Sequence, residues 1–265
     1  MHSRRVSLLL AFGWLSLLAG LATGADWLGD PLRMDLAARV QAPDASHWLG
    51  TDELGRDLVA RVLHAARFSL MVTAGATALA LTLGFVLGTA AAWFGRYVDA
   101  AVMALVNLFW SVPFAVFAVL LVAIIGANTT TLIVAIGGVN WVSSARVFRS
   151  EMLRLRRIEF VVSARAAGFG PWQILFMHAM PNLRAATIGL LGYGAAETLA
   201  LESGLAFLGL SLPPPLPTWG GMMADGLAHF SVGWWIVAVP AATITITLAS
   251  LRALAEVVGE TPHSA

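Results

Sequence analysis

Residues 68–95 read FSLMVTAGATALALTLGFVLGTAAAWFG, and these 28 residues carry no charged side chain. A helix needs about 20 mainly apolar residues to cross a membrane, so this stretch is long enough for one full crossing. Gly84 and Gly88, with Ala80 and Ala92, form a line of small residues, which is typical of a face where two helices pack closely. The stretch therefore predicts a transmembrane helix with one closely packed face.

The composition of the whole chain agrees with a membrane protein. Of its 265 residues 58% are hydrophobic and only 12% are charged, and the mean hydropathy is +0.80. A soluble domain carries about 25% charged residues. We therefore exclude a water-soluble globular fold, a disordered chain and a nucleic-acid-binding module. Because the chain has no cysteine and all its basic residues are arginine, disulfides, thiolate metal sites, a P-loop and a Schiff base are excluded as well.

Gaps between charged residues predict an all-α polytopic membrane protein with six transmembrane helices. These helices cover about residues 6–24, 68–93, 101–125, 131–148, 185–210 and 233–257. Pro113 lies inside the third helix and should kink it. The first helix has a signal peptide as its alternative, although its apolar run is longer than the roughly 7–15 residues usual there.

The predicted helices divide the chain and give it an orientation. The parts are a first helix (1–25), a polar segment (26–67), a core of five helices (68–258) that includes a polar segment (149–184), and a tail (259–265). If the N-terminus lies inside, the inner segments hold 11 of the 16 arginines. The positive-inside rule therefore predicts cytoplasmic termini, a cytoplasmic segment 149–184 and an extracytoplasmic segment 26–67.

The polar segment 149–184 has the pattern of two short helices joined by a tight turn. Apolar residues recur at helical spacing over 159–168, and glycines and a proline then break the helix. A second helical run over 172–180 should stop at Pro181. Small residues near the turn would let another surface come close: Ser163, Ala164 and Gly168. An amphipathic helix lying on lipid headgroups is the alternative interpretation.

Segment 149–184 resembles the cytoplasmic loop of the integral-membrane permeases of ATP-binding-cassette importers. That loop has the form Glu-Ala-Ala, three residues, Gly, nine residues, Ile, one residue, Leu-Pro. Laid on this chain, its positions fall on Val162, Ser163, Ala164, Gly168, His178, Met180 and Pro181. The acidic position is lost, and Glu159 lies one helical turn away. The resemblance implies that this segment contacts a cytoplasmic ATPase subunit.

The polar segment 26–67 resembles one particular subfamily of these permeases. Residues 47–57 read HWLGTDELGRD and are similar to the Leu-Gly-Thr-Asp-x-x-Gly-Arg-Asp motif of the dipeptide, oligopeptide and nickel permease subfamily. We expect Arg56 to be held by a nearby carboxylate and Gly55 to permit a tight turn. The motif then either ties down the outer loop or contacts a docking protein or the solute. Its candidate residues are Gly50, Thr51, Asp52, Gly55, Arg56 and Asp57.

Several polar side chains lie within the predicted helices and are candidates for a translocation pathway. They are Asn107, Asn140, Ser143, Glu197 and Glu202. A carboxylate in hydrocarbon costs several kcal/mol, so it normally faces protein or a water-filled cavity. Glu197 is the better candidate because it lies about halfway along its helix. A hydrogen bond between helices, or a protonated carboxyl group, is the alternative for both acids.

No pattern of catalytic or metal-ligating residues is visible. The six histidines are scattered, and none pairs with an acid at ligand spacing, so we expect no metal or cofactor in this chain and no enzyme activity of its own. The resemblance implies a permease subunit in the lipid of the bacterial inner membrane, with the type I importer permease fold. Its implied partners are a second related permease, two ATPase subunits that bind ATP and Mg, and an extracytoplasmic solute-binding protein.

The solute and the energy source are the open points. The subfamily handles nickel, metal chelates and di- or oligopeptides, and the short N-terminus before the first helix favours nickel or a metal chelate. A secondary transporter or channel driven by an ion gradient is the alternative, with Glu197 as its ion site.

Overall fold

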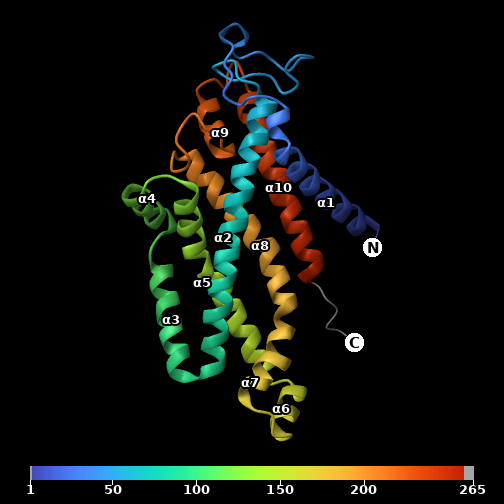
Figure 1. The fold of residues 1–265 in the computed structure, drawn as a ribbon, viewed down its shortest axis with the longest axis vertical. Helices are drawn as coiled ribbons and strands as arrows, with labels where there is room; N and C mark the ends of the chain where they lie inside the picture. The colour runs from blue at the N-terminus through green and yellow to red at the C-terminus, as the bar shows by residue number, and fades with distance from the viewer. Residues whose placement is uncertain (1, 260–265) are drawn as a thin grey trace.

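Long apolar helices dominate the computed structural model, which describes residues 2–259 (Figure 1). Among these residues, five helices are long and apolar enough to cross a membrane: α1 (His2–Thr23), α2 (Leu58–Phe94), α5 (Thr129–Leu155), α8 (Arg184–Phe207) and α10 (Trp235–Gly259). A bent pair, α3 (Arg96–Ser111) and α4 (Phe114–Ile125), makes a sixth crossing if it is counted as one. No β-strand occurs among residues 2–259, so the predicted all-α membrane fold is confirmed.

Short elements connect the long helices. They are η1 (Ala25–Trp27), η2 (Leu36–Ala38), α6 (Glu159–Ala166), α7 (Pro171–Gln173), η3 (Ile174–Ala179), η4 (Met180–Leu183) and α9 (Trp219–Leu227). Most of them gather at the two ends of an elongated bundle. Figure 1 shows the loop before α2 together with α9 at one end, which we call the α9 end, and α6 with α7 at the other, the α6 end. Because α1 begins and α10 finishes on the side facing the α6 end, both ends of the described chain point the same way. Of the predicted tail (259–265), Gly259 is the last residue of α10, and the rest lies outside the described residues.

The centre of the bundle is the close contact between α2 and α5. Methyl groups added to Gly84 and Gly88 of α2 would collide with Ser144 and with the backbone of Ala145. Gly137 of α5 lies in the same contact. The closely packed face predicted from the small residues is therefore confirmed. This contact fixes the position of α5, and so of its polar side chains, relative to α2.

The predicted kink at Pro113 is a complete break in the helix. The two halves are bent by 86° relative to each other, and Val112 between them is extended. A residue before proline disfavours the helical conformation, and proline has no N–H to continue the hydrogen-bond ladder. The chain therefore turns α4 across the bundle instead of continuing α3.

The predicted stop at Pro181 is wrong. The chain runs as one helical segment over Pro171–Phe207, so the span expected at 185–210 begins earlier. A π-turn at Ile174–Ala179 and a 3-10 turn at Met180–Leu183 lie directly before α8. A wide turn followed by a tight one accommodates the proline ring and its missing N–H without ending the helix.

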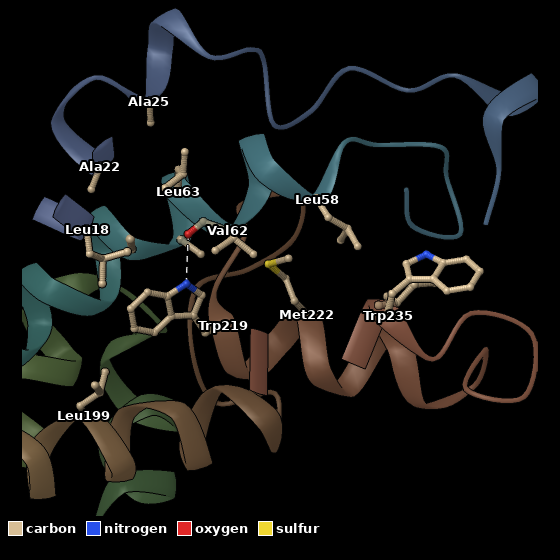
Figure 2. Packing of buried hydrophobic residues seen from close by; sticks show 13 residues of the cluster. Leu18, Ala22, Ala25, Leu58, Val62, Leu63, Leu199, Trp219, Met222 and Trp235 are labelled. Carbon is tan, nitrogen blue, oxygen red and sulfur yellow. Dashed lines mark hydrogen bonds between the residues drawn. The ribbon is translucent and has the colours of Figure 1, made fainter. Parts of the chain in front are cut away.

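A hydrophobic cluster at the α9 end fixes the short helix α9 against the long ones. Trp219 is completely buried, and its indole Nε1 donates a hydrogen bond to the carbonyl of Val62, 3.0 Å away (Figure 2). Leu58 from α2, Met222 from α9 and Trp235 from α10 belong to the same cluster. The α9 end is thus a packed structure rather than a loose loop region.

Candidate functional site

Three of the predicted pathway residues share one cavity, which lies about halfway along the lengths of α5 and α8. Asn140 and Ser143 of α5 and Glu197 of α8 line a space of about 330 Å³. The aromatic rings of Phe109, Trp110 and Phe114 also line it, and they come from the two halves of the broken helix. The break at Pro113 therefore supplies one wall of this cavity.

The polar groups of this cavity are not satisfied within the chain. Glu197 and Ser143 are exposed at the surface of the bundle, whereas the Asn140 amide nitrogen is buried without a hydrogen-bond partner. A carboxylate at mid-bundle cannot face hydrocarbon at low cost. The arrangement suits contact with water, with a polar solute or with another protein subunit.

The other two predicted pathway residues lie elsewhere. Asn107 of α3 accepts a hydrogen bond of 3.2 Å from the Arg146 guanidinium, which also lies 3.6 Å above the Trp110 ring. Glu202 of α8 is completely buried, and Ser203 Oγ lies 3.4 Å from one of its oxygens. Neither side chain lines the cavity of Glu197, so the structure brings together three of the five candidates.

At the α6 end, the turn predicted after the first short helix is present. The backbone N–H of Phe169 donates to the carbonyl of Ala164 at 3.1 Å, and Gly168 between them has φ +86°. This is a common helix termination, which glycine favours because an L side chain strains that conformation. The Gly168 position opens to space, with no atom within 4 Å of an added methyl group. Strain in the turn, rather than crowding inside the chain, therefore limits substitution there.

The residues of the expected ATPase contact surround this turn. Val161 is buried, whereas Val162, Ser163 and Gly168 are exposed and Ala164 is half-buried. The His178 ring packs edge-on against Phe160 and Phe169, with centroids 6.1 and 5.7 Å away, and so joins the π-turn to α6. Pro181 lies beyond His178 in the 3-10 turn. The segment thus has an inner side that packs on itself and an outer side of small or exposed residues.

An apolar patch that was not predicted from the sequence lies at the same end. Its exposed side chains are Phe160, Val162, Phe169, Trp172, Phe176 and Met177. Trp172 stacks on Phe176 with centroids 5.9 Å apart and also packs on Phe94 of α2. Contiguous exposed apolar surface marks contact sites for proteins or membranes. The run of aromatic residues at 169–176 was the signal that could have revealed this patch.

The motif at 50–57 is a tightly bonded turn at the α9 end. The Asp52 carboxylate accepts hydrogen bonds from the backbone N–H groups of Leu54 and Arg56, both at 2.9 Å, and from Arg56 Nε at 2.7 Å. Gly55 has φ +72°, and a methyl group there would overlap the backbone of Asp35. Arg56 is thus held by a carboxylate, and Gly55 makes the turn, as the sequence predicts.

The remaining motif residues connect this turn to two long helices. Asp57 caps α2 by accepting a hydrogen bond of 3.1 Å from the backbone N–H of Ala60, and it lies 2.8 Å from His47 Nδ1. The carbonyl of Thr51 accepts from Trp235 Nε1 of α10 at 3.2 Å. A methyl group on Gly50 would meet the same indole ring. These contacts connect the loop before α2 with α2 and α10.

Two acids outside the helical spans have lowered pKa values. Ser46 Oγ, at 2.6 Å, and backbone N–H groups donate to Asp44 and lower its pKa from 3.8 to about 2. Arg67 makes a bidentate contact of 2.8 and 2.9 Å with Asp26 and lowers the pKa of that carboxyl. Both acids therefore stay ionised well below neutral pH. Among residues 2–259, no group of three or more His, Asp or Glu side chains could hold a metal ion.

Comparison with known proteins supports a transport role. Residues 80–259 match the family described as the binding-protein-dependent transport system inner membrane component. The chain belongs to this permease family. This permease is 37% identical over 208 residues to a candidate peptide permease of Brucella suis. The aligned residues make up 78% of this chain and 69% of the relative.

A second relative and a solved structure extend the comparison. The nickel transport system permease protein NikC of Escherichia coli is 35% identical over 225 residues, or 84% of this permease and 81% of the relative. The inward-facing MetNI methionine ABC transporter has a chain with the same fold, with a TM-score of 0.59 at 15% identity, covering 75% of this permease and 96% of that chain. The predicted resemblance to peptide and nickel permeases, and the predicted ABC importer permease fold, are confirmed.

Proposed function

We propose that this permease is one of two related transmembrane subunits of an ATP-driven importer in a bacterial inner membrane. It takes nickel, a metal chelate, or a di- or oligopeptide from an extracytoplasmic binding protein and forms half of the pathway. ATP and Mg belong to two partner ATPase subunits on the cytoplasmic side. The observation that carries the proposal is the exposed carboxylate of Glu197 beside Ser143 and Asn140, on a mid-bundle cavity of about 330 Å³.

The second permease subunit completes this cavity. An exposed carboxylate in hydrocarbon costs several kcal/mol, which a facing subunit and an aqueous pathway between the two would avoid. The negative charge of Glu197 favours solutes that carry a positive group, such as a peptide amine or a metal cation. The aromatic rings beside it provide apolar contact for the rest of the solute.

The α6 end lies on the cytoplasmic side, and the ATPase subunits move it when they bind ATP. In this orientation 11 of the 16 arginines lie in cytoplasmic segments, in agreement with the positive-inside rule. Both ends of the described chain point toward the same side of the membrane as the α6 end. The exposed apolar patch around Trp172 and the outer side of α6 dock on an ATPase subunit. Phe160 of α6 packs on His178, which belongs to the continuous helical segment Pro171–Phe207. Movement at α6 therefore reaches Glu197 through this contact and along that segment.

Replacing Ala164 by leucine tests the docking. Ala164→Leu enlarges the outer side of α6, whereas Ala100→Leu makes the same change at an exposed position of α3 at the same end of the bundle. We expect both variants to insert normally and only Ala164→Leu to lose ATP-dependent uptake. Normal uptake by Ala164→Leu at normal expression would contradict the docking role.

The solute and the energy source are tested in one vesicle assay. Radiolabelled nickel and a radiolabelled dipeptide are compared as substrates of the assembled transporter, with and without ATP. We expect accumulation of one of them, and only with ATP. Accumulation that continues after ATP is exhausted, and collapses with the ion gradient, would instead favour a secondary transporter or channel.

A further inference from the structure

A second cavity, of about 400 Å³, lies at the α9 end. The proline-rich loop after α8, the first turn of α2 and helix α9 enclose it. Its polar lining residues are Arg56, Arg61, Ser211, Thr218 and Asp225. It shares no lining residue with the cavity of Glu197. The two spaces are therefore separate sites.

Arg61 is the unusual residue of this cavity. Its side chain is only 4% exposed, and its Nε and Nη1 atoms are buried without a hydrogen-bond partner. Arg61 forms an ion pair with Asp52, whose Oδ2 lies 3.2 Å from Nε and also accepts from Arg56 at 2.7 Å. The charge of Arg61 is therefore paired, but its Nη1 donor is buried without an acceptor. A buried donor without an acceptor costs free energy, so this N–H group calls for a ligand or another function.

Ser211 adds a second unpartnered group to the same lining. It is 4% exposed, and its Oγ is buried without a hydrogen-bond partner. Arg56, in contrast, is satisfied by Asp52 and by Glu53, whose carboxylate lies 2.9 Å from Nη2. The cavity lining therefore holds two buried donors without an acceptor, Nη1 of Arg61 and Oγ of Ser211. A guanidinium beside a hydroxyl is a donor set that suits a carboxylate.

Asp225 supplies a carboxylate to the same lining. It is exposed on α9 and lines the same space, so a ligand that carried only negative charge would be repelled there. A ligand with a carboxylate and an amine would satisfy both the donors and Asp225. The volume lies at the small end of the range of about 300–1,000 Å³ typical of ligand sites. The prolines over Pro213–Pro217 restrict the loop and preorganise the wall.

We propose that this cavity binds a small zwitterion. The carboxylate of the ligand accepts hydrogen bonds from Arg61 and Ser211, and its ammonium group faces Asp225. The site is separate from the pathway, and its occupancy can be measured by equilibrium binding in the absence of ATP and of transport. Its failure would leave the proposed transport function untouched.

Isothermal titration of the full chain in lipid nanodiscs with glycylglycine tests the site. Glycylglycinamide, which lacks the carboxylate, and N-acetylglycylglycine, which lacks the amine, are the matched probes. We expect glycylglycine to bind at least about tenfold more tightly than either analogue, since each loses a charge-assisted hydrogen bond or ion pair. Equal binding of all three, or no binding of glycylglycine at millimolar concentration, would overturn the proposal.

Variants locate the bound molecule. Arg61→Gln should weaken glycylglycine binding about tenfold or more, but it also removes a buried charge beside Asp52 and could unfold the loop. Ser211→Ala and Asp225→Asn avoid that problem, because the Ser211 hydroxyl has no partner to lose and Asp225 is exposed. Each should weaken binding several-fold, whereas Ala100→Leu should not change it. Unchanged binding in both variants, or loss of binding only in Glu197→Gln, would place the molecule elsewhere and refute the site.

Discussion

Two neighbouring glycines of α5 allow a matched test of the packing that holds the bundle together. A methyl group on Gly137 would lie 2.7 Å from the carbonyl oxygen of Ala76 and 3.0 Å from Cβ of Leu79, both on α2. A methyl group on Gly138, the next residue, would have no atom within 4 Å. The two alanine variants therefore differ in the contact with α2 and very little in composition.

The expected difference follows from two opposing terms. Gly→Ala within a helix gains about 1 kcal/mol of helix propensity, and both variants receive this gain. Overpacking a close contact costs about 1–3 kcal/mol, and only Gly137→Ala incurs it, because the nearest opposing atom is a backbone carbonyl oxygen that cannot rotate away. Gly138→Ala should thus be more stable than Gly137→Ala by about 1–3 kcal/mol. For a chain of this size, that corresponds to roughly 2–10 °C in the unfolding midpoint.

Thermal unfolding in detergent, followed by the fluorescence of the ten tryptophans, measures the difference. Wild type should lie between the two variants, or close to Gly137→Ala if overpacking costs only about 1 kcal/mol. Equal midpoints, or a higher midpoint for Gly137→Ala, would show that α2 and α5 do not approach as closely as described. That result would also remove the argument that the polar side chains of α5 are fixed beside the core.

Three further predictions concern the cavity, the hydrophobic cluster and the outer loop. Glu197→Gln should raise the KM for a cationic solute about tenfold at unchanged insertion, because one attractive charge is lost; an unchanged KM would remove Glu197 from the pathway. Trp219→Phe should lower the free energy of unfolding by about 1–3 kcal/mol, because a buried hydrogen bond to the Val62 carbonyl is lost and the smaller ring leaves a void; the exposed Trp172→Phe is the control, and equal losses would argue against the hydrogen bond. Because the pKa of Asp44 is lowered from 3.8 to about 2, its stabilising effect is present above pH 3.8 and is lost as the pH falls toward 2. Most of the difference in melting temperature between wild type and Asp44→Asn should therefore disappear over that interval, and a difference at pH 2 as large as that at pH 5 would contradict it.

The sequence by itself determined the class of protein, the positions of most membrane helices and the family resemblance. These are local properties, since a run of apolar residues must match the thickness of the membrane wherever it lies in the fold. The close face of α2 was also readable, because residues four apart share one side of a helix. The carboxylate that holds Arg56 lies four residues from it, so that contact could be expected from the motif alone.

Tertiary structure decided which polar residues meet. Asn140 and Glu197 belong to different helices, and whether they share a cavity depends on how α5 and α8 are rotated and crossed, which no local pattern fixes. The same holds for Arg61 and Ser211, which are 150 positions apart in the sequence and line one cavity in the folded chain. The continuation of the helix through Pro181 also depended on packing, because neighbouring contacts offset the missing hydrogen bond. Long-range contacts of this kind reflect the free energy of the whole bundle rather than that of any one segment.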